Sequence, residues 1–189
     1  FMRGMQDNGV IACAKHFPGH GDTATDSHHA LPVLDFPMER LDTLELYPFR
    51  KLMDDGVEMV MVGHLQVPAL DTLPASVSYN VITGLLRKKM NYDGIITTDA
   101  LNMKGVLAPF DGSTNVLPSE HTSPERTFCL WPKHITESID LIVNYIGNDP
   151  KKLEDLDRRV SRILMMKIIC GKLLISREST HAVAYDEIF

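Results

Sequence analysis

The side chains best suited to chemistry lie between Lys15 and Pro32, a segment whose glycines and prolines indicate a loop. Asp26 and His28 lie two residues apart in it, and in an extended segment this spacing points both side chains to the same side. A carboxylate beside an imidazole fixes its tautomer and favours its protonated form. His28 is therefore suited to act first as a general acid and then as a general base. On these residues alone, a solvated polar loop is the other interpretation.

The remaining polar groups fit the chemistry of a ligand with many hydroxyls, such as a sugar. Lys15 supplies three hydrogen-bond donors, and His16 can donate or accept. Asp99 directly follows the run Gly94 to Thr98, and a carboxylate there can attack an anomeric carbon to form a covalent glycosyl-enzyme. Spacing alone supports a helix N-cap or a turn residue equally well for Asp99.

The elements that must position these residues follow from a unit that occurs three times. Each unit is a turn dipeptide, a short apolar run and a polar ending: Asn8-Gly9, 10–14 and Lys15-His16; Asp55-Gly56, 57–62 and Gly63-His64; Asp93-Gly94, 95–98 and Asp99. Continuous apolarity predicts strands buried on both faces, as in a parallel sheet. Because functional groups in such sheets gather at the carboxyl ends of the strands, the three polar endings indicate one pocket.

Helical patterns separate and follow these runs. They cover 38–54, with Pro48 in a first turn, 79–91, with Ser78 as N-cap, and then 133–146 and 151–170. Alternating strands and helices predict a parallel α/β architecture. Residues 107–128 break the pattern where a helix and a fourth strand are expected, and only 128–132 resembles that strand.

Composition narrows the classes of partner. The chain has a formal net charge of −6 and a pI near 5.7, so it carries no basic footprint for nucleic acid. Its apolar runs are too short to span a membrane. Cys13, Cys129 and Cys170 have unrelated spacings, which predicts reduced core residues. The compartment stays open between the cytoplasm and the periplasm of a bacterial-type cell.

Together, the loop from Lys15 to Pro32, the strand end at His64 and residues 93–103 resemble glycoside hydrolase family 3. Within this family, the loop resembles that of the beta-N-acetylhexosaminidases of the muropeptide-recycling, or peptidoglycan-recycling, type. The resemblance covers about 2–107 and resumes over 131–170. It implies a parallel (β/α)8 TIM barrel, of which this chain supplies about the last four β/α units. The first half-barrel should then lie before Phe1.

The resemblance also implies roles for the candidate residues. Asp99 would be the nucleophile and His28 the acid/base, with Asp26 as its partner, while Lys15 and His16 would hold sugar hydroxyls. His64 would line the pocket. The implied reaction is retaining hydrolysis of a terminal beta-linked N-acetylhexosamine, such as N-acetylglucosamine, through a covalent glycosyl-Asp intermediate. It needs no metal or organic cofactor.

We interpret 1–175 as part of the catalytic barrel and 176–189 as a linker or tail. Whether a further C-terminal domain follows Phe189 is open from the sequence. Residues 107–130 are aberrant for the family, and compensating frameshifts between Gly112 and Leu130 would explain them. A nucleotide sequence incompatible with the shifted codons would refute that hypothesis.

Two alternative functions are open. The chain could be a truncated, inactive fragment of such an enzyme. It could also be a metal-dependent barrel hydrolase whose ligands are drawn from one cluster: His16, His20, Asp22, Asp26, His28, His29 and His64.

Overall fold

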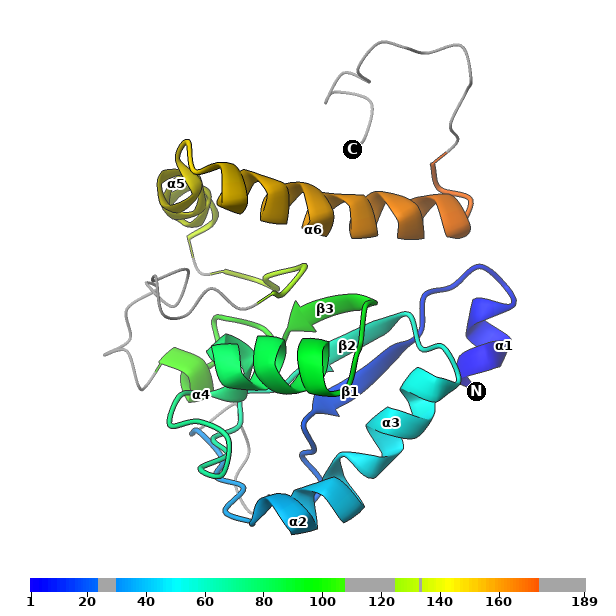
Figure 1. Ribbon diagram of the computed structural model, residues 1–189, viewed down its shortest axis with the longest axis vertical. Coiled ribbons are helices and arrows are strands. Elements are labelled where there is room, and N and C mark those ends of the chain that lie inside the picture. The colour runs from blue at the N-terminus through cyan, green and yellow to red at the C-terminus, as the bar shows by residue number, and fades with distance from the viewer. Residues whose placement is uncertain (24–29, 108–124, 133, 174–189) are drawn as a thin grey trace.

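The computed structural model describes residues 1–23, 30–107, 125–132 and 134–173. Three strands, β1 (Cys13–Phe17), β2 (Met59–Val62) and β3 (Ile95–Thr98), form one parallel sheet in the order β1-β2-β3. The helical elements are α1 (Met2–Gln6), α2 (Met38–Arg40), η1 (Leu41–Glu45), α3 (Tyr47–Asp54), η2 (Ala75–Val77), η3 (Asn80–Lys89), α4 (Lys104–Leu107), α5 (Ile135–Ile146) and α6 (Pro150–Ile169). Figure 1 shows the three strands side by side, all pointing the same way. The predicted parallel α/β architecture is confirmed.

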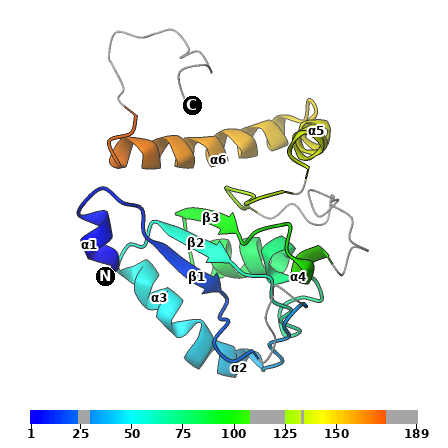
Figure 2. The same ribbon diagram turned by 180° about the vertical axis from the view of Figure 1, so that it is seen from behind.

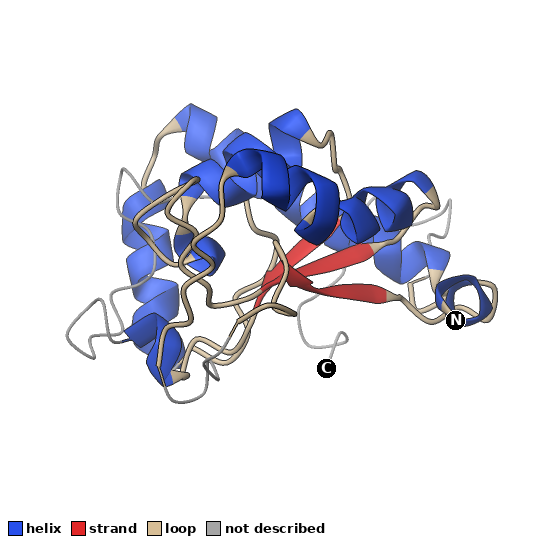
Figure 3. Ribbon diagram, turned by 90° about the horizontal axis from the view of Figure 1, so that it is seen from below, coloured by secondary structure: helices blue, strands red, loops and turns tan. Residues whose placement is uncertain are grey.

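The main core lies between the sheet and the helices of the first two units. Figure 3 shows helices gathered over one side of the strands. The buried residues of the main core come from all three strands and from the helices packed on the sheet. They include Phe17, Leu46, Phe49, Val60, Val62, Leu86 and Ile96. All four residues of β3 are buried, as its continuous apolar run predicts. The core therefore holds the carboxyl ends of the strands in a fixed arrangement.

The turn dipeptides before the strands have the backbone geometry that glycine favours. Gly9 and Gly56 have φ values of 73° and 81°, where a side chain would be strained. At Gly94 the reason is a close approach, since a Cβ atom there would lie 2.3 Å from the Tyr92 hydroxyl. These glycines explain why each strand begins directly after a tight turn.

The helix signals are also confirmed in part. The Val81 amide donates to the Ser78 hydroxyl over 3.0 Å, which is the contact expected of an N-cap, and Pro48 lies in the first turn of α3. The restart predicted at Pro48 within 38–54 is confirmed, because α3 begins at Tyr47. The part before it was not predicted to divide, and π-type turns at Leu41–Glu45 separate it into α2 and η1.

The first strand differs from its prediction. It begins at Cys13, where pairing with Met59 of β2 starts, and it includes Lys15 and His16. Its register is irregular between Ala14 and Phe17, and the Lys15-His16 and Phe17-Pro18 peptide bonds are cis. The polar pair is therefore part of the strand.

All three cysteines are free thiols, as predicted, but the prediction that they are core residues is wrong for Cys13. Cys13 is exposed, whereas the buried residues of β1 are Ala14 and Phe17. Cys129 and Cys170 are half-buried, and Cys129 packs against the smaller core cluster that contains Val77 and Leu101.

A short segment beside β3 occupies the place of the expected fourth strand. Thr97 pairs in parallel with Phe128, and the Thr127 and Phe128 amides donate to the Ile96 carbonyl at 2.7 and 3.0 Å. Beyond this bridge, the Leu101 amide donates to the Leu130 carbonyl over 2.9 Å. The rest of the aberrant region, 108–124, lies outside the described residues.

The helices α5 and α6 confirm the predicted helices at 133–146 and 151–170. Figures 1 and 2 show α6 running across one side of the sheet, with α5 seen end-on beside it. Arg162 of α6 donates to Asp93, and Arg159 donates to the Arg126 carbonyl over 2.9 Å. Within the described ranges, no helix has the length and apolarity needed to cross a membrane.

Candidate active site

Asp99 lies at the carboxyl end of β3 and is held by hydrogen bonds to the backbone of neighbouring residues. Its amide donates to the Val62 carbonyl over 2.9 Å, which continues the pairing with β2 by one residue. Its carboxylate oxygen Oδ1 accepts the Ala100 amide over 2.8 Å. The side chain is 18% exposed, so one carboxylate oxygen is fixed while the group still reaches the surface. This is the arrangement that a nucleophile needs.

His16 meets Asp99 across the end of β2. Its Nε2 atom lies 3.6 Å from Asp99 Oδ2. His16 belongs to β1 and Asp99 directly follows β3, and these are the two outer strands of the three-stranded sheet. Gly63 at the end of β2 makes room for the ring, because a Cβ atom there would lie 3.0 Å from the Cβ of His16. The structure thus brings together two residues that the sequence predicts to share a site.

His64 is placed differently from its prediction. The residue is 0% exposed and lies behind the surface that Asp99 and His16 share. Its Nδ1 atom is 2.6 Å from the Ser76 hydroxyl, and its Nε2 atom is 2.8 Å from the Ala100 carbonyl. Burial lowers the pKa of His64 below its usual value, against the opposite influence of the Ala100 carbonyl and of Asp99. A neutral ring therefore supports the peptide unit that follows Asp99.

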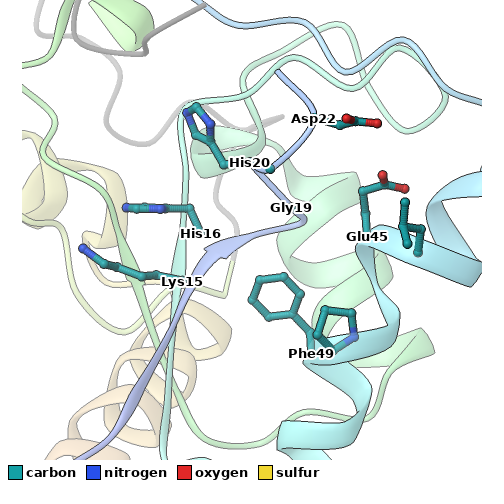
Figure 4. A pocket seen from close by; sticks show the side chains of 10 residues that line it. Lys15, His16, Gly19, His20, Asp22, Glu45 and Phe49 are labelled. Atoms are coloured by element: carbon teal, nitrogen blue, oxygen red, sulfur yellow. The ribbon is translucent and has the colours of Figure 1, made fainter. Parts of the chain in front are cut away.

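A hollow of about 330 Å³ lies beside this centre, on the side of the sheet edge formed by β1. Figure 4 shows the side chains of Lys15 and His16 pointing to the same side of the strand, away from Glu45 and Phe49, which lie on its other side. Asp99 does not line the hollow. The residues that line it are Lys15, His16, Gly19, His20, Gly21, Asp22, Leu44, Glu45, Pro48 and Phe49. The candidate site is therefore the pair of Asp99 and His16, and the hollow lies next to it.

Hydrogen-bonded ion pairs hold the start of the loop after β1 against α2 and η1. Arg40 donates to Asp22 over 2.7 Å and to Glu45 over 2.9 Å, and the Glu45 side chain is almost fully buried. Gly19 fits against Glu45, because a Cβ atom there would lie 2.8 Å from the Cβ of Glu45. Asp26 and His28 follow in the loop but lie outside the described residues.

These fastening residues were missed by sequence reasoning, although one signal was present. Glu45 lies four residues after Leu41 and four before Phe49, so it occupies a core position in an apolar helical stripe. A carboxylate at such a position requires a partner, and here the partner is Arg40. Ser76 had no comparable signal.

The residues of the metal hypothesis do not form a metal centre in the part of the chain that the structure describes. Among those residues, no group of three or more histidine, cysteine or carboxylate side chains could hold an ion. Three members of the proposed ligand cluster lie outside it: Asp26, His28 and His29.

Comparison with known proteins assigns this geometry to a family. Residues 1–166 match the glycosyl hydrolase family 3 N-terminal domain. A beta-hexosaminidase of Chromobacterium violaceum is 40% identical over 104 residues, which are 55% of this chain and 29% of that protein. Beta-hexosaminidase A of Pseudoalteromonas piscicida is 37% identical over 118 residues, which are 56% of this chain and 20% of that protein. The chain thus spans less than a third of the length of these relatives.

Solved structures agree with the sequence comparison. A glycoside hydrolase family 3 beta-N-acetylglucosaminidase from Paenibacillus superposes with a TM-score of 0.76 at 35% identity, over 99% of this chain and 37% of that one. The beta-N-acetylglucosaminidase of Thermotoga maritima gives a TM-score of 0.65 at 28% identity, over 86% of this chain and 35% of that one.

Proposed function

Because the chain belongs to the glycosyl hydrolase family 3 N-terminal domain family, we propose that it carries the nucleophile of a retaining beta-N-acetylhexosaminidase. Such a glycosidase removes terminal beta-linked N-acetylhexosamine, in this case N-acetylglucosamine. The named relatives are beta-hexosaminidases and beta-N-acetylglucosaminidases, which supports this sugar class. The observation that carries the proposal is Asp99 at the end of β3, with His16 Nε2 3.6 Å from its carboxylate.

Asp99 performs the first chemical step. Its Oδ1 atom is engaged by the Ala100 amide, which leaves Oδ2, the atom facing His16, to attack the anomeric carbon. The new carbon–oxygen bond forms as the glycosidic bond breaks, and the leaving oxygen takes a proton from His28. The product of this step is a covalent glycosyl-Asp99 ester and a free aglycone.

Water then releases the sugar. His28, now neutral, removes a proton from water as the water oxygen attacks the anomeric carbon and the bond to Asp99 breaks. Two displacements at one carbon retain the beta configuration. Asp26 orients the His28 ring, whereas Lys15 and His16 bind sugar hydroxyls. In this role a histidine replaces the second carboxylate of most glycosidases.

The chain would supply about the last four units of a (β/α)8 barrel within 1–175, with 176–189 as a linker or tail. Three parallel strands and the segment beside β3 support this, as does its coverage of 37% of the Paenibacillus enzyme. The remaining strands, and the further sugar contacts on them, would come from a preceding half-barrel. A further C-terminal domain is part of the same proposal.

The test is turnover of 4-nitrophenyl N-acetyl-β-glucosaminide by the wild-type chain and by Asp99→Asn. We expect the substitution to lower kcat to background, a loss of roughly 10⁴-fold or more, because the amide cannot form the ester. Asp93→Asn is the matched control, since Asp93 lies at the opposite end of β3 and is exposed. We expect it to retain wild-type turnover.

Two further readouts separate the alternatives. NMR of the first-formed product should show the β-anomer, and an α-anomer would exclude the retaining mechanism. Full activity of Asp99→Asn would exclude Asp99 as nucleophile. Activity lost to a chelator would favour the metal-dependent hydrolase. A wild-type chain without turnover would be the truncated, inactive fragment.

A further inference from the structure

We propose that His64 is a positioning residue, which sets the orientation of the Asp99 carboxylate through the peptide unit of Ala100. The inference rests on the proposed function, because it assigns a purpose to His64 in the step that Asp99 performs. It adds a buried support, made of His64 and Ser76, to a site otherwise built from surface groups.

The hydrogen bonds of His64 define a single neutral tautomer. The Ala100 carbonyl can only accept, so the Nε2 atom 2.8 Å away must carry the proton. In a neutral ring Nδ1 then has a lone pair, and it accepts the Ser76 hydroxyl over 2.6 Å. Proton donation therefore runs in one direction, from Ser76 through His64 to the Ala100 carbonyl.

This chain of hydrogen bonds ends at the nucleophile. His64 holds the carbonyl of Ala100, and the amide of the same residue holds Asp99 Oδ1 over 2.8 Å. The Asp99 amide is bonded to Val62, which lies two residues before His64 in the chain. Two residues at the end of β2 thus hold the backbone around Asp99. The Val62 carbonyl accepts the Asp99 amide, and the His64 ring donates to the carbonyl of the next residue, Ala100.

Simple packing would not require a histidine here. A buried imidazole costs free energy unless both of its nitrogens are satisfied, whereas a leucine would fill a similar volume without that requirement. The ring is 0% exposed and both nitrogens have partners. Ser76 is itself held in place, because Arg126 donates to its backbone carbonyl over 3.3 Å. The polar group is therefore part of a built support and not an isolated core residue.

The variants separate positioning from packing. His64→Gln keeps an amide N–H donor near the position of Nε2, whereas His64→Leu removes the donor and keeps the volume. Ser76→Ala removes the hydroxyl that orients the ring. Ser78→Ala is its matched control, because both serines are 0% exposed but Ser78 bonds to Val81 and Asp71 instead.

The first readout is NMR of the full chain, which does not depend on activity. We expect the ¹⁵N shifts of His64 to report the neutral Nε2–H tautomer at pH 7. The Ala100 amide and the Asp99 carboxylate carbon should shift in His64→Leu, shift less in His64→Gln and stay unchanged in Ser78→Ala. The inference would be overturned if the His64 ring were protonated or in the Nδ1–H tautomer. It would also be overturned if the Ala100 and Asp99 resonances were the same in His64→Leu as in wild type.

The second readout is the rate at which 5-fluoro-N-acetylglucosaminyl fluoride labels Asp99, followed by intact-mass spectrometry. We expect His64→Leu to slow labelling about 100-fold, because small displacements of a reacting group carry penalties of that size. His64→Gln should recover most of the rate, and Ser78→Ala should label like wild type. Wild-type labelling rates in folded His64→Leu would overturn the inference.

The two proposals fail in different ways. A wild-type chain that takes no label is the truncated, inactive fragment, and the NMR shifts then decide the role of His64 by themselves. If His64→Leu does not fold, the role of His64 is decided by the tautomer of the wild-type ring and by the comparison of Ser76→Ala with Ser78→Ala. Equal effects of these two serine variants on the Ala100 amide would overturn it.

Discussion

The parallel sheet with its helices and the pair α5 and α6 differ in where their apolar side chains lie. Every residue of β3 is buried, and η3 buries Val81, Ile82, Leu85 and Leu86. In α5 Ser138 is the single buried residue, and α6 has no buried residue. The amphipathic stripe of α6 contains Leu153, Leu156, Val160 and Leu164, which are all exposed.

An apolar stripe becomes a core only where a second apolar face covers it. The sheet region has such a face in its own helices, so it fixes the site internally. The helix α6 is joined to the sheet region by polar contacts, from Arg162 to Asp93 and from Arg159 to the Arg126 carbonyl. The geometry around Asp99 should therefore depend on the sheet region far more than on α5 and α6.

The largest difference in stability is expected from one substitution made in both regions. Leu86→Ala in η3 empties a fully buried site and should lower the free energy of unfolding by about 2–5 kcal/mol. Leu164→Ala in α6 removes a side chain that is 39% exposed, so its effect should stay within about 0.5 kcal/mol. Urea unfolding followed by circular dichroism measures both. Equal losses would show that α6 is packed as tightly as the sheet region.

A smaller effect is expected from a buried arginine. Arg87 Nη1 donates to the Tyr92 and Gly94 carbonyls over 2.7 and 2.6 Å, and burial lowers the pKa of Arg87 to about 10. Arg87→Met leaves these carbonyls unpaired before β3, which should cost about 1–3 kcal/mol in urea unfolding.

Arg158→Met is the matched control, because Arg158 is exposed and its ion pair is confined to α6. We expect little change from this substitution. A loss as large as that of Arg87→Met would contradict the contrast between the regions.

The smallest effect is expected from pH. The pKa of His64 is lowered in the folded chain, first by burial and then by the nearby His16, while Asp99 and the Ala100 carbonyl act the other way. The unfolded chain binds the proton first, near pH 6.5, so this contribution to stability is present above that pH and is lost as the pH falls. Urea unfolding between pH 8 and pH 5 should show a steeper loss in wild type than in His64→Gln. His134→Gln, at an exposed position before α5, should follow wild type.

Much of the fold followed from local patterns. The turn dipeptides at Gly9 and Gly56, the N-cap at Ser78 and the continuous apolar run of β3 each depend on neighbouring residues, so they could be predicted. The π-type turns at Leu41–Glu45 could not be predicted, because they accompany the packing of Glu45 beside Arg40 and Gly19. The exposure of Cys13 depends on its place in an edge strand, which periodicity does not reveal.

Residue types and short spacings were enough to select Lys15, His16 and Asp99 as candidate site residues and to predict that they lie at the carboxyl ends of strands. Only the tertiary structure decided that His16 meets Asp99 across β2, and that His64 turns away from the surface toward Ser76 and the Ala100 carbonyl. The physical reason is that pairing three parallel strands sets distances between residues far apart in the chain. Burial then requires a polar ring to find its partners wherever the fold provides them.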